Sequence, residues 1–316
     1  MNNFFDNQRI FTLIWKRKFH FVIVGVIAII LSAIFSGPTF IRPMYKSTAR
    51  IYPSNIGEMS EESKTEQMVE IINSNDIKLK MIESFPLNED FKIKKDDPLY
   101  LTYMFDIYNK NISVSKTQYE TVELSVLDFY PQRASDMCDS LIQFYNQQVG
   151  NIYKAKNLEM IQILENQLHK KKTEYDSVVT NLNKVRSESG IIDFKEQVSE
   201  VTRGYMTALA NGRGSTSDAK QIKNLYDNMI ESGAQAYLLE RNMNYLMENI
   251  DSLQTLYDLN LSEYEKVITY SHVVEKAFPA DKKAYPVRWL IVLFSLVSAV
   301  FMAMLVFLVL DYRKEQ

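Results

Sequence analysis

Two long apolar stretches, one near each end of the sequence, most constrain what this chain can fold into. The second covers residues 287–310 and holds one charged residue, Arg288, at its edge. At about 1.5 Å per residue, a helix of this length crosses a hydrocarbon core of roughly 30 Å. The first covers residues 19–35 and extends to Ile41 if the helix continues through Gly37 and Pro38. We therefore predict two transmembrane helices, residues 19–41 and 287–310.

The positive residues that precede the first stretch predict the orientation. Four of them lie within residues 1–18: Arg9, Lys16, Arg17 and Lys18. Because cytoplasmic flanks carry an excess of Lys and Arg, residues 1–18 are expected in the cytoplasm, together with a short tail, residues 311–316. A cleaved signal peptide is the alternative, but no A-x-A-like site follows the apolar run.

Small residues recur at four-residue spacing in both stretches. They are Ala28, Ser32 and Ser36 in the first, and Ser295, Ala299 and Ala303 in the second. Such spacing lets two helix backbones approach closely in lipid, so we predict that these residues form packing faces; chance is the alternative, since small residues are common in spans.

Residues 42–130 carry the pattern of a small α/β domain. Residues 45–53 alternate as a strand, residues 61–85 have an approximate 3.6-residue apolar period, and Asp97-Pro98 predicts a further helix start. Residues 111–116 and 121–128 then alternate as two strands of a hairpin. This region is the predicted membrane-proximal base.

Residues 131–270 are predicted to form long helices with coiled-coil-like seams. The first seam lies between residues 161 and 185, and Gly190 is the expected left-handed residue after its helix. The second seam comprises Leu239, Met243, Leu246, Ile250, Leu253, Tyr257, Asn260, Tyr264 and Val267. An antiparallel hairpin within one chain fits this pattern, and so does pairing between subunits.

Residues 271–286 are predicted to return the chain to the membrane through a last strand and a proline-containing tail. Pro279 and Pro286 stiffen this tail, and Arg288 follows at the start of the second span. The predicted fold class is an α+β membrane protein whose two transmembrane helices flank an external domain with an α/β base and a projecting helical hairpin.

The composition excludes several classes of function. A net charge of −3 provides no basic surface for nucleic acid. The single cysteine and three scattered histidines provide no metal site. Gly212-Arg213-Gly214-Ser215 lacks the spacing and the Lys of a phosphate-binding loop. We therefore predict no catalytic, cofactor-binding or metal-binding residues and no enzymatic activity. The alternative is a catalytic carboxylate pair in a cleft, which the 39 Asp and Glu residues permit, but the solvated faces of long helices are the preferred interpretation of these charges.

Four segments resemble the Wzz-type polysaccharide co-polymerases, the chain-length determinants of O-antigen and related surface glycans. They are the post-span strand Tyr45–Pro53, the Asp128-x-x-Pro131-x-x-Ala134 helix start, the Ser187–Phe194 break, and the tail Val273–Ile291. The chain departs from the family pattern where Lys282 and Lys283 replace one of three spaced prolines, and its second span lacks Pro and Gly.

The resemblance implies a homo-oligomeric ring in the bacterial inner membrane, with the bulk of each chain in the periplasm. It also implies a role in setting the length of a lipid-linked or growing polysaccharide, together with a membrane glycan polymerase. No fused tyrosine kinase is expected after the second span, although a separate kinase partner is compatible with the resemblance.

Two other classes of protein share parts of this layout. A two-span sensor with a helical periplasmic domain would need a cytoplasmic signalling domain, for which the six residues after Leu310 leave no room. An export-pump adaptor also carries a long helical hairpin, but has one span and Gly-rich β domains. The chain-length regulator is the preferred hypothesis.

Overall fold

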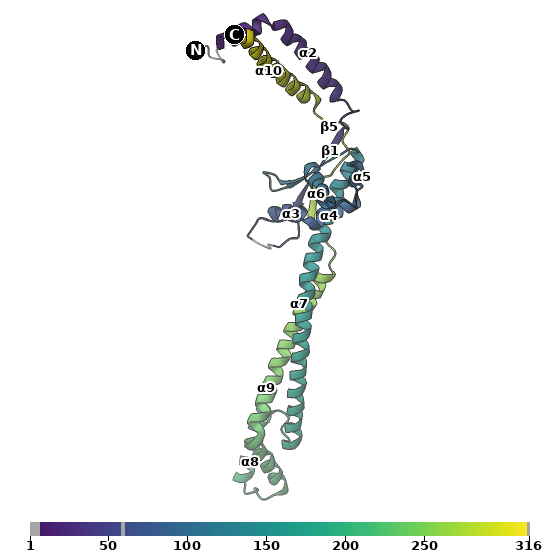
Figure 1. The fold of residues 1–316 in the computed structure, drawn as a ribbon. Coiled ribbons are helices and arrows are strands. Elements are labelled where there is room, and N and C mark those ends of the chain that lie inside the picture. The colour runs from purple at the N-terminus through teal and green to yellow at the C-terminus, as the bar shows by residue number, and fades with distance from the viewer. Residues whose placement is uncertain (1–6, 58–60, 315–316) are drawn as a thin grey trace. The chain divides into compact units, whose positions relative to one another are not determined.

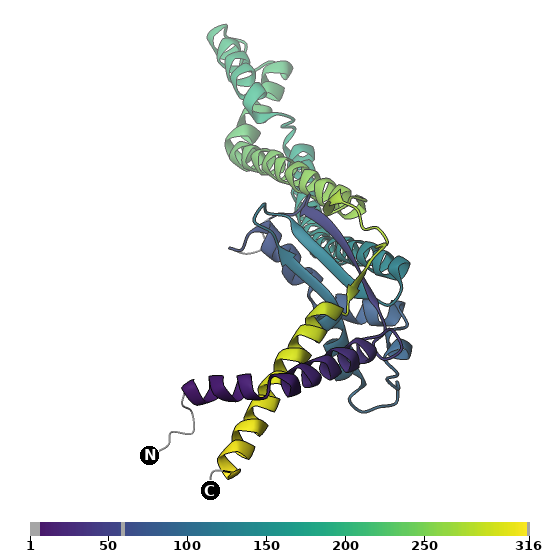
Figure 2. The ribbon, with the colours of Figure 1, turned by 90° about the horizontal axis from the view of Figure 1, so that it is seen from above.

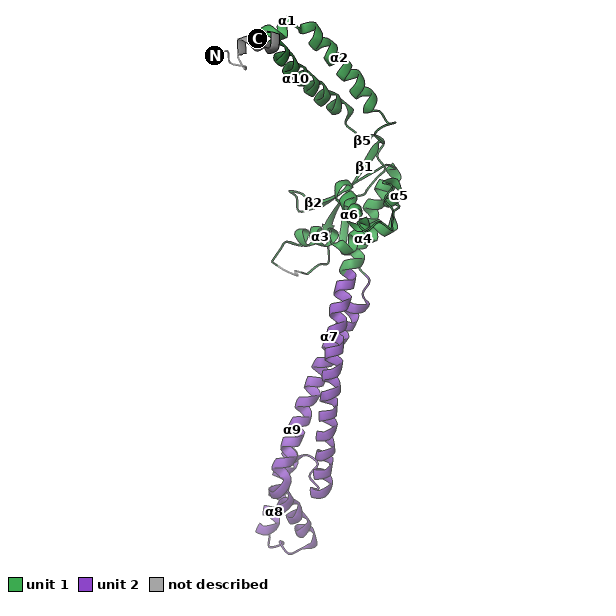
Figure 3. Ribbon diagram, viewed as in Figure 1, with its two compact units in different colours: residues 1–149, 268–316 green, residues 150–267 purple. Residues whose placement is uncertain are grey.

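The structure is a computed structural model that describes residues 7–57 and 61–314. The start of the predicted cytoplasmic segment and the last two residues of the predicted tail lie outside these ranges. The described chain divides into two compact units, residues 1–149 with 268–316, and residues 150–267 (Figure 3). We describe each unit by itself.

Unit 1 contains the two apolar helices predicted from the sequence. After the short helix α1 (Asn7–Lys16) come α2 (Lys18–Phe35) and, at the other end of the chain, α10 (Arg288–Lys314). Their apolar ranges are Lys18–Phe35 and Arg288–Asp311, and the 18-residue windows in them have mean hydropathies of 2.4 and 2.8. By length and composition, both helices can cross a bilayer.

The ends of these helices differ from the predicted ends. Helix α2 ends at Phe35 rather than Ile41. The reason is local: Pro38 has no N–H to continue the helix, and it disfavours helical backbone at the residue before it. Helix α10 instead continues to Lys314, so the first part of the predicted tail 311–316 is helical.

An antiparallel sheet in unit 1 pairs strands from the N-terminal part of the chain with strands from its C-terminal part (Figure 2). Its strand order is β2-β3-β1-β4, and β5 also pairs with β1. The strands are β1 (Met44–Pro53), β2 (Ile112–Lys116), β3 (Val122–Asp128), β4 (Ser271–Glu275) and β5 (Lys283–Tyr285). Because β1 follows α2 while β4 and β5 precede α10, β1 connects the segments next to both apolar helices.

The sheet follows the predicted two-residue alternation. Ser47, Ala49 and Ile51 of β1 are buried, and β3 buries every second residue from Val122 to Asp128. In the register, Ala49 lies opposite Leu124, which is also fully buried. Strand β5 was not predicted, because three residues are too short to show a period.

Helices complete the base around this sheet. They are α3 (Lys64–Ile72), α4 (Asn75–Ser84), α5 (Leu87–Asp90), α6 (Tyr100–Asn111) and the first turns of α7 (Pro131–Ser189). Their buried side chains include Met68, Met81, Tyr108, Leu141 and Tyr145.

Two local predictions in the base need correction. The helix predicted over residues 61–85 is broken at Asn73-Ser74, between α3 and α4. The Asp97-Pro98 pair does not open a helix directly, since α6 begins at Tyr100. Asp97 Oδ1 instead accepts a hydrogen bond from the Leu99 backbone N–H at 2.8 Å, which forms a turn before the helix.

Unit 2 is helical. It comprises the rest of α7, helix α8 (Phe194–Ala210) and helix α9 (Ser217–Glu265), which runs back alongside α7 (Figure 1). Gly190 has φ of +71°, as expected for the residue after α7. Helix α9 begins with Thr216 as N-cap and ends at Glu265. The predicted seam residue Val267 therefore lies outside the helix, and it is 91% exposed.

The boundaries of the units also differ from the predicted helical segment, residues 131–270. The first turns of α7, up to Val149, belong to unit 1. The reason is burial, because Ala134, Met137, Leu141 and Tyr145 are at most 1% exposed there.

Candidate functional site: the paired apolar helices and the sheet that joins them

Helices α2 and α10 pack against each other. Near the start of α2, the rings of Phe21 and Phe307 meet edge to face at 5.3 Å between centroids. In the middle, Gly25 is buried, and a Cβ atom placed on it would lie 3.2 Å from Leu296 Cδ1. Glycine therefore permits the close approach of the two helices, and Gly25 was missed although it lies three residues before Ala28.

The predicted small-residue faces lie near this contact. Ala28, Ser32, Ser36 and Ser295 line one groove between α2 and α10, together with Ile291. The Ser32 and Ser36 hydroxyls donate to carbonyls of their own helix, those of Ile29 and Ala33. Their hydroxyls are thus engaged within α2, and the small side chains leave space for the groove. The other two predicted residues, Ala299 and Ala303, are half-buried further along α10.

The three predicted residues before the second span occupy separate positions. Pro279 is exposed in the loop after β4, Pro286 is buried directly after β5, and Arg288 is the exposed first residue of α10. The loop is anchored beside Pro279, where Ser47 Oγ donates a hydrogen bond to the Phe278 carbonyl at 2.9 Å. The pairing of β5 with β1, between Met44 and Tyr285, fixes the segment before Pro286.

A half-buried ionic cluster fixes the start of α7, and sequence reasoning did not identify it. Arg133 donates through Nε and one terminal nitrogen to both carboxylate oxygens of Asp128, at 2.9 and 2.8 Å. The same guanidinium also contacts Asp90, which lies 3.6 Å from Arg42. The only sequence signal was the Asp128-x-x-Pro131 motif, in which Arg133 is not a motif position.

The cluster pairs two arginines, Arg42 and Arg133, with two aspartates, Asp90 and Asp128. Burial lowers the pKa of Arg133, but hydrogen bonds and charge from Asp128 and Asp90 outweigh burial and raise the pKa overall. Arg42 completes the cluster by stacking its guanidinium over Phe129 at 4.0 Å. Because Arg42 lies in the short segment between α2 and β1, the cluster ties that segment to the base.

A second polar contact holds the returning chain. Asn146, on α7, accepts a hydrogen bond from the Tyr270 backbone N–H at 2.6 Å and donates one to Ser271 Oγ at 2.8 Å. Asn55 donates to the Thr269 carbonyl of the same segment at 2.9 Å. These amides position the chain just before β4.

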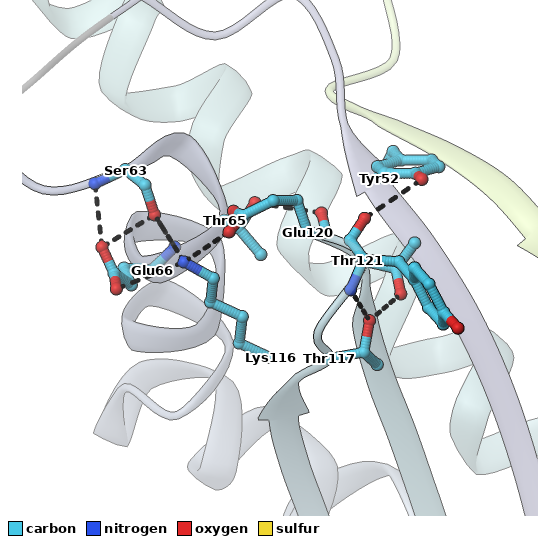
Figure 4. Close-up of polar contacts among 9 residues, drawn as sticks. Tyr52, Ser63, Thr65, Glu66, Lys116, Thr117, Glu120 and Thr121 are labelled. Atoms are coloured by element: carbon cyan, nitrogen blue, oxygen red, sulfur yellow. Dashed lines mark hydrogen bonds and ion pairs between the residues drawn. The ribbon is translucent and has the colours of Figure 1, made fainter.

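A third polar cluster attaches α3 to the β2–β3 hairpin (Figure 4). Ser63 and Glu66 form a capping box at the start of α3. Hydrogen bonds from Ser63 to the Glu66 carboxylate, followed by contacts with Lys116, lower the pKa of Glu66. Lys116 also pairs with Glu120 at 2.9 Å, and Thr65 donates to the Glu120 carbonyl at 3.1 Å.

These clusters connect elements of the fold, and their charges pair with one another. In the described ranges, no group of three or more His, Cys, Asp or Glu side chains is arranged to hold a metal ion. The sheet of unit 1 thus connects the apolar helices α2 and α10 to the start of α7, since β1 follows α2, β5 precedes α10 and β3 precedes α7.

One protein-family model matches the N-terminal part of the chain. Residues 3–85 match the family model described as Wzz, chain length determinant protein. We call this matched part, residues 3–85, the Wzz segment. The resemblance expected from the sequence is confirmed, and the Wzz segment contains α2, β1, α3 and α4. A search of curated proteins finds no match to the chain.

Solved structures of polysaccharide co-polymerases are similar to this chain at low sequence identity. A full-length bacterial polysaccharide co-polymerase is 12% identical with a TM-score of 0.44, over 96% of this chain and 97% of that one. The wild-type Shigella flexneri lipopolysaccharide O-antigen chain-length regulator WzzBSF is 14% identical with a TM-score of 0.33, over 75% of this chain and 99% of that one.

A fragment of WzzB, a polysaccharide co-polymerase from Salmonella Typhimurium, is 12% identical with a TM-score of 0.31, over 77% of this chain and 100% of that one. Because these TM-scores lie below 0.5, the similarity to Wzz proteins rests on the family match over residues 3–85.

Proposed function

We infer that this protein is a membrane-anchored regulator of the chain length of a surface polysaccharide, such as O-antigen or a related glycan. The observation that carries this inference is the Wzz chain length determinant match over residues 3–85. The matched segment contains the first apolar helix, α2, and the central strand, β1, which pairs with β3, β4 and β5.

We further propose that both apolar helices lie in the bacterial inner membrane, with both termini cytoplasmic. The support is the group of positive residues before or at the start of α2, together with the length and hydropathy of α2 and α10. The sheet and the long helices then lie in the periplasm, where a surface polysaccharide is extended. The regulator acts there as a scaffold rather than as an enzyme.

Several copies are proposed to assemble into a ring that works with a membrane glycan polymerase on lipid-linked repeat units. Exposed apolar residues on α9 support an assembly: Leu238, Tyr245, Leu256 and Leu259. They are separated by seven, eleven and three residues, close to multiples of the helical repeat, so they lie along one face of α9. A second copy of this chain is the proposed partner for that face.

The chain-length role is tested in cells from which the gene has been deleted, beside the parent and a complemented strain. A gel of surface polysaccharide should show the modal band cluster of the parent collapse into an unregulated ladder and return on complementation. A polymer of unchanged length distribution in the deletion strain contradicts the proposal.

The assembly is tested separately on purified protein in mild detergent. Leu238→Ser with Tyr245→Ser should reduce the particle mass measured by light scattering, because two exposed apolar contacts are lost. The matched control replaces exposed polar residues of the same helix, Asn244→Ser with Thr255→Ser, and should keep the parent mass. A monomeric mass for the parent chain contradicts the ring.

A further inference from the structure

The groove between α2 and α10 is apolar and lies at the ends of these helices that adjoin the sheet. Its volume is about 410 Å³, and its apolar lining includes Leu31, Phe35, Ile41 and Ile291. Two of its three hydroxyl groups, those of Ser32 and Ser36, donate to their own helix. The groove therefore offers apolar contact and little hydrogen bonding to an occupant.

Positive charge lies next to this groove. Arg288, Ile291 and Ser295 are spaced by three and four residues, so they share one face of α10, and the last two line the groove. Lys283 lies opposite Tyr45 in the β5–β1 pairing, and Tyr45 is four residues after the groove residue Ile41.

These charges have no carboxylate partner within the described ranges. No ion pair with a described residue involves Lys282, Lys283 or Arg288. The local sequence places one acidic residue, Asp281, against these three cations. The segment 281–288 thus carries a net charge of +2, and it leads directly into the face of α10 that lines the groove.

We propose that the groove holds an acyl chain of a bilayer phospholipid with an anionic headgroup, and that Arg288 and Lys283 bind its phosphate. The proposal rests on the membrane placement given above. A guanidinium is suited to phosphate oxygens because its N–H groups form a planar fork, and an ammonium adds a second charge. Complementary charge at the mouth and apolar lining below it match the two parts of such a lipid.

Trp289 provides a reporter next to the site. The chain has two tryptophans, and Trp15→Phe leaves Trp289 as the single fluorophore. Its side chain is 68% exposed, so a bound lipid can reach it. The experiment uses this full-length variant in a neutral detergent, with phosphatidylglycerol or phosphatidylcholine spin-labelled near the top of an acyl chain.

Phosphatidylglycerol should quench Trp289 at a mole fraction at least about fivefold lower than phosphatidylcholine, since each basic residue near a membrane surface contributes roughly fivefold in affinity for anionic lipid. Lys283→Gln with Arg288→Gln should abolish this preference. Lys283→Arg with Arg288→Lys should retain it, which separates loss of charge from loss of fold. The control Lys170→Gln with Lys172→Gln removes two exposed charges from α7 and should leave the preference unchanged.

Equal quenching by the two lipids in the parent, or a preference that survives the double glutamine variant, overturns the proposal. So does relief of quenching by a polyprenyl phosphate at a lower mole fraction than by unlabelled phosphatidylglycerol, which would assign the groove to a carrier lipid. The assay reads lipid binding by purified protein, so its outcome is independent of the polysaccharide gel that tests the chain-length role.

Discussion

At the scale of single residues, burial sets the chemistry of the only cysteine, Cys138. Burial raises the pKa of its thiol to about 12, although a hydrogen bond to the Ser47 carbonyl lowers it in part. At pH 8 about one thiol in 10⁴ is then ionised, against roughly a quarter for a free thiol of pKa near 8.5. We expect iodoacetamide to modify Cys138 at least about 1000-fold more slowly in the native chain than in guanidinium chloride. Equal rates would show that the thiol is accessible.

Gly233 is a residue at which the usual effect of a substitution reverses. Replacing a glycine inside a helix by alanine ordinarily favours the helix by about 1 kcal/mol. A Cβ atom at Gly233, however, would overlap Cε2 of Phe194, so the ring would have to leave its place on α9. We expect Gly233→Ala to lower the protection of α8 amides in hydrogen exchange.

Gly204 is the matched control for this substitution, because it also lies inside a helix. Its nearest neighbour to a new Cβ atom is Ile222 Cγ2 at 3.9 Å, an ordinary contact. Gly204→Ala should therefore maintain or increase the protection of α8. Phe194→Leu in the Gly233→Ala background should restore part of the lost protection. Protection of α8 that is the same in Gly233→Ala as in the parent would contradict the packing of Phe194 on Gly233.

At the scale of elements, the packing of α2 on α10 can be tested by cross-linking. Ser32 and Ser295 line the same groove. Ser32→Cys with Ser295→Cys should form a disulfide within one chain under mild oxidation, seen as faster migration on a non-reducing gel. The buried Cys138 does not need to be removed, since its raised pKa makes it a poor nucleophile.

The control pair keeps Ser32→Cys and moves the second cysteine to Ser298. The Ser298 side chain is exposed on α10 and does not line the groove. This pair should cross-link much more slowly. A product of twice the chain mass from the first pair, without the faster-migrating species, would mean that α2 pairs with α10 of another subunit instead.

At the scale of the whole molecule, the two units differ in how much they bury. Strands β1 and β3 of unit 1 contain fully buried residues, including Ala49, Ile51 and Leu124, whereas α8 of unit 2 has no buried residue. Because local opening is easiest where few apolar contacts are lost, amides of β1 and β3 should exchange most slowly and those of α8 rapidly. Exchange in α8 as slow as in β1 would contradict this order.

Features that depend on a local pattern were predictable from the sequence. The apolar helices α2 and α10, the alternation in β1 and the glycine after α7 each follow from the chemistry of neighbouring residues. Helix ends were less predictable, as α2 and α6 show, because a proline or an Asx turn shifts an end by a few residues. The Wzz resemblance was also accessible, since its motifs lie in these local elements.

Contacts between residues that are distant in sequence became visible only in the folded chain. Arg133 meets Asp90 across 43 residues, Asn146 meets Ser271 across 125, and the short strand β5 exists because β1 pairs with it. No local period marks such residues. Likewise, the boundary between the units falls inside α7, because the first turns of that helix bury apolar side chains in unit 1 while the helix itself continues to Ser189. Burial against distant segments, rather than helix propensity, sets that boundary.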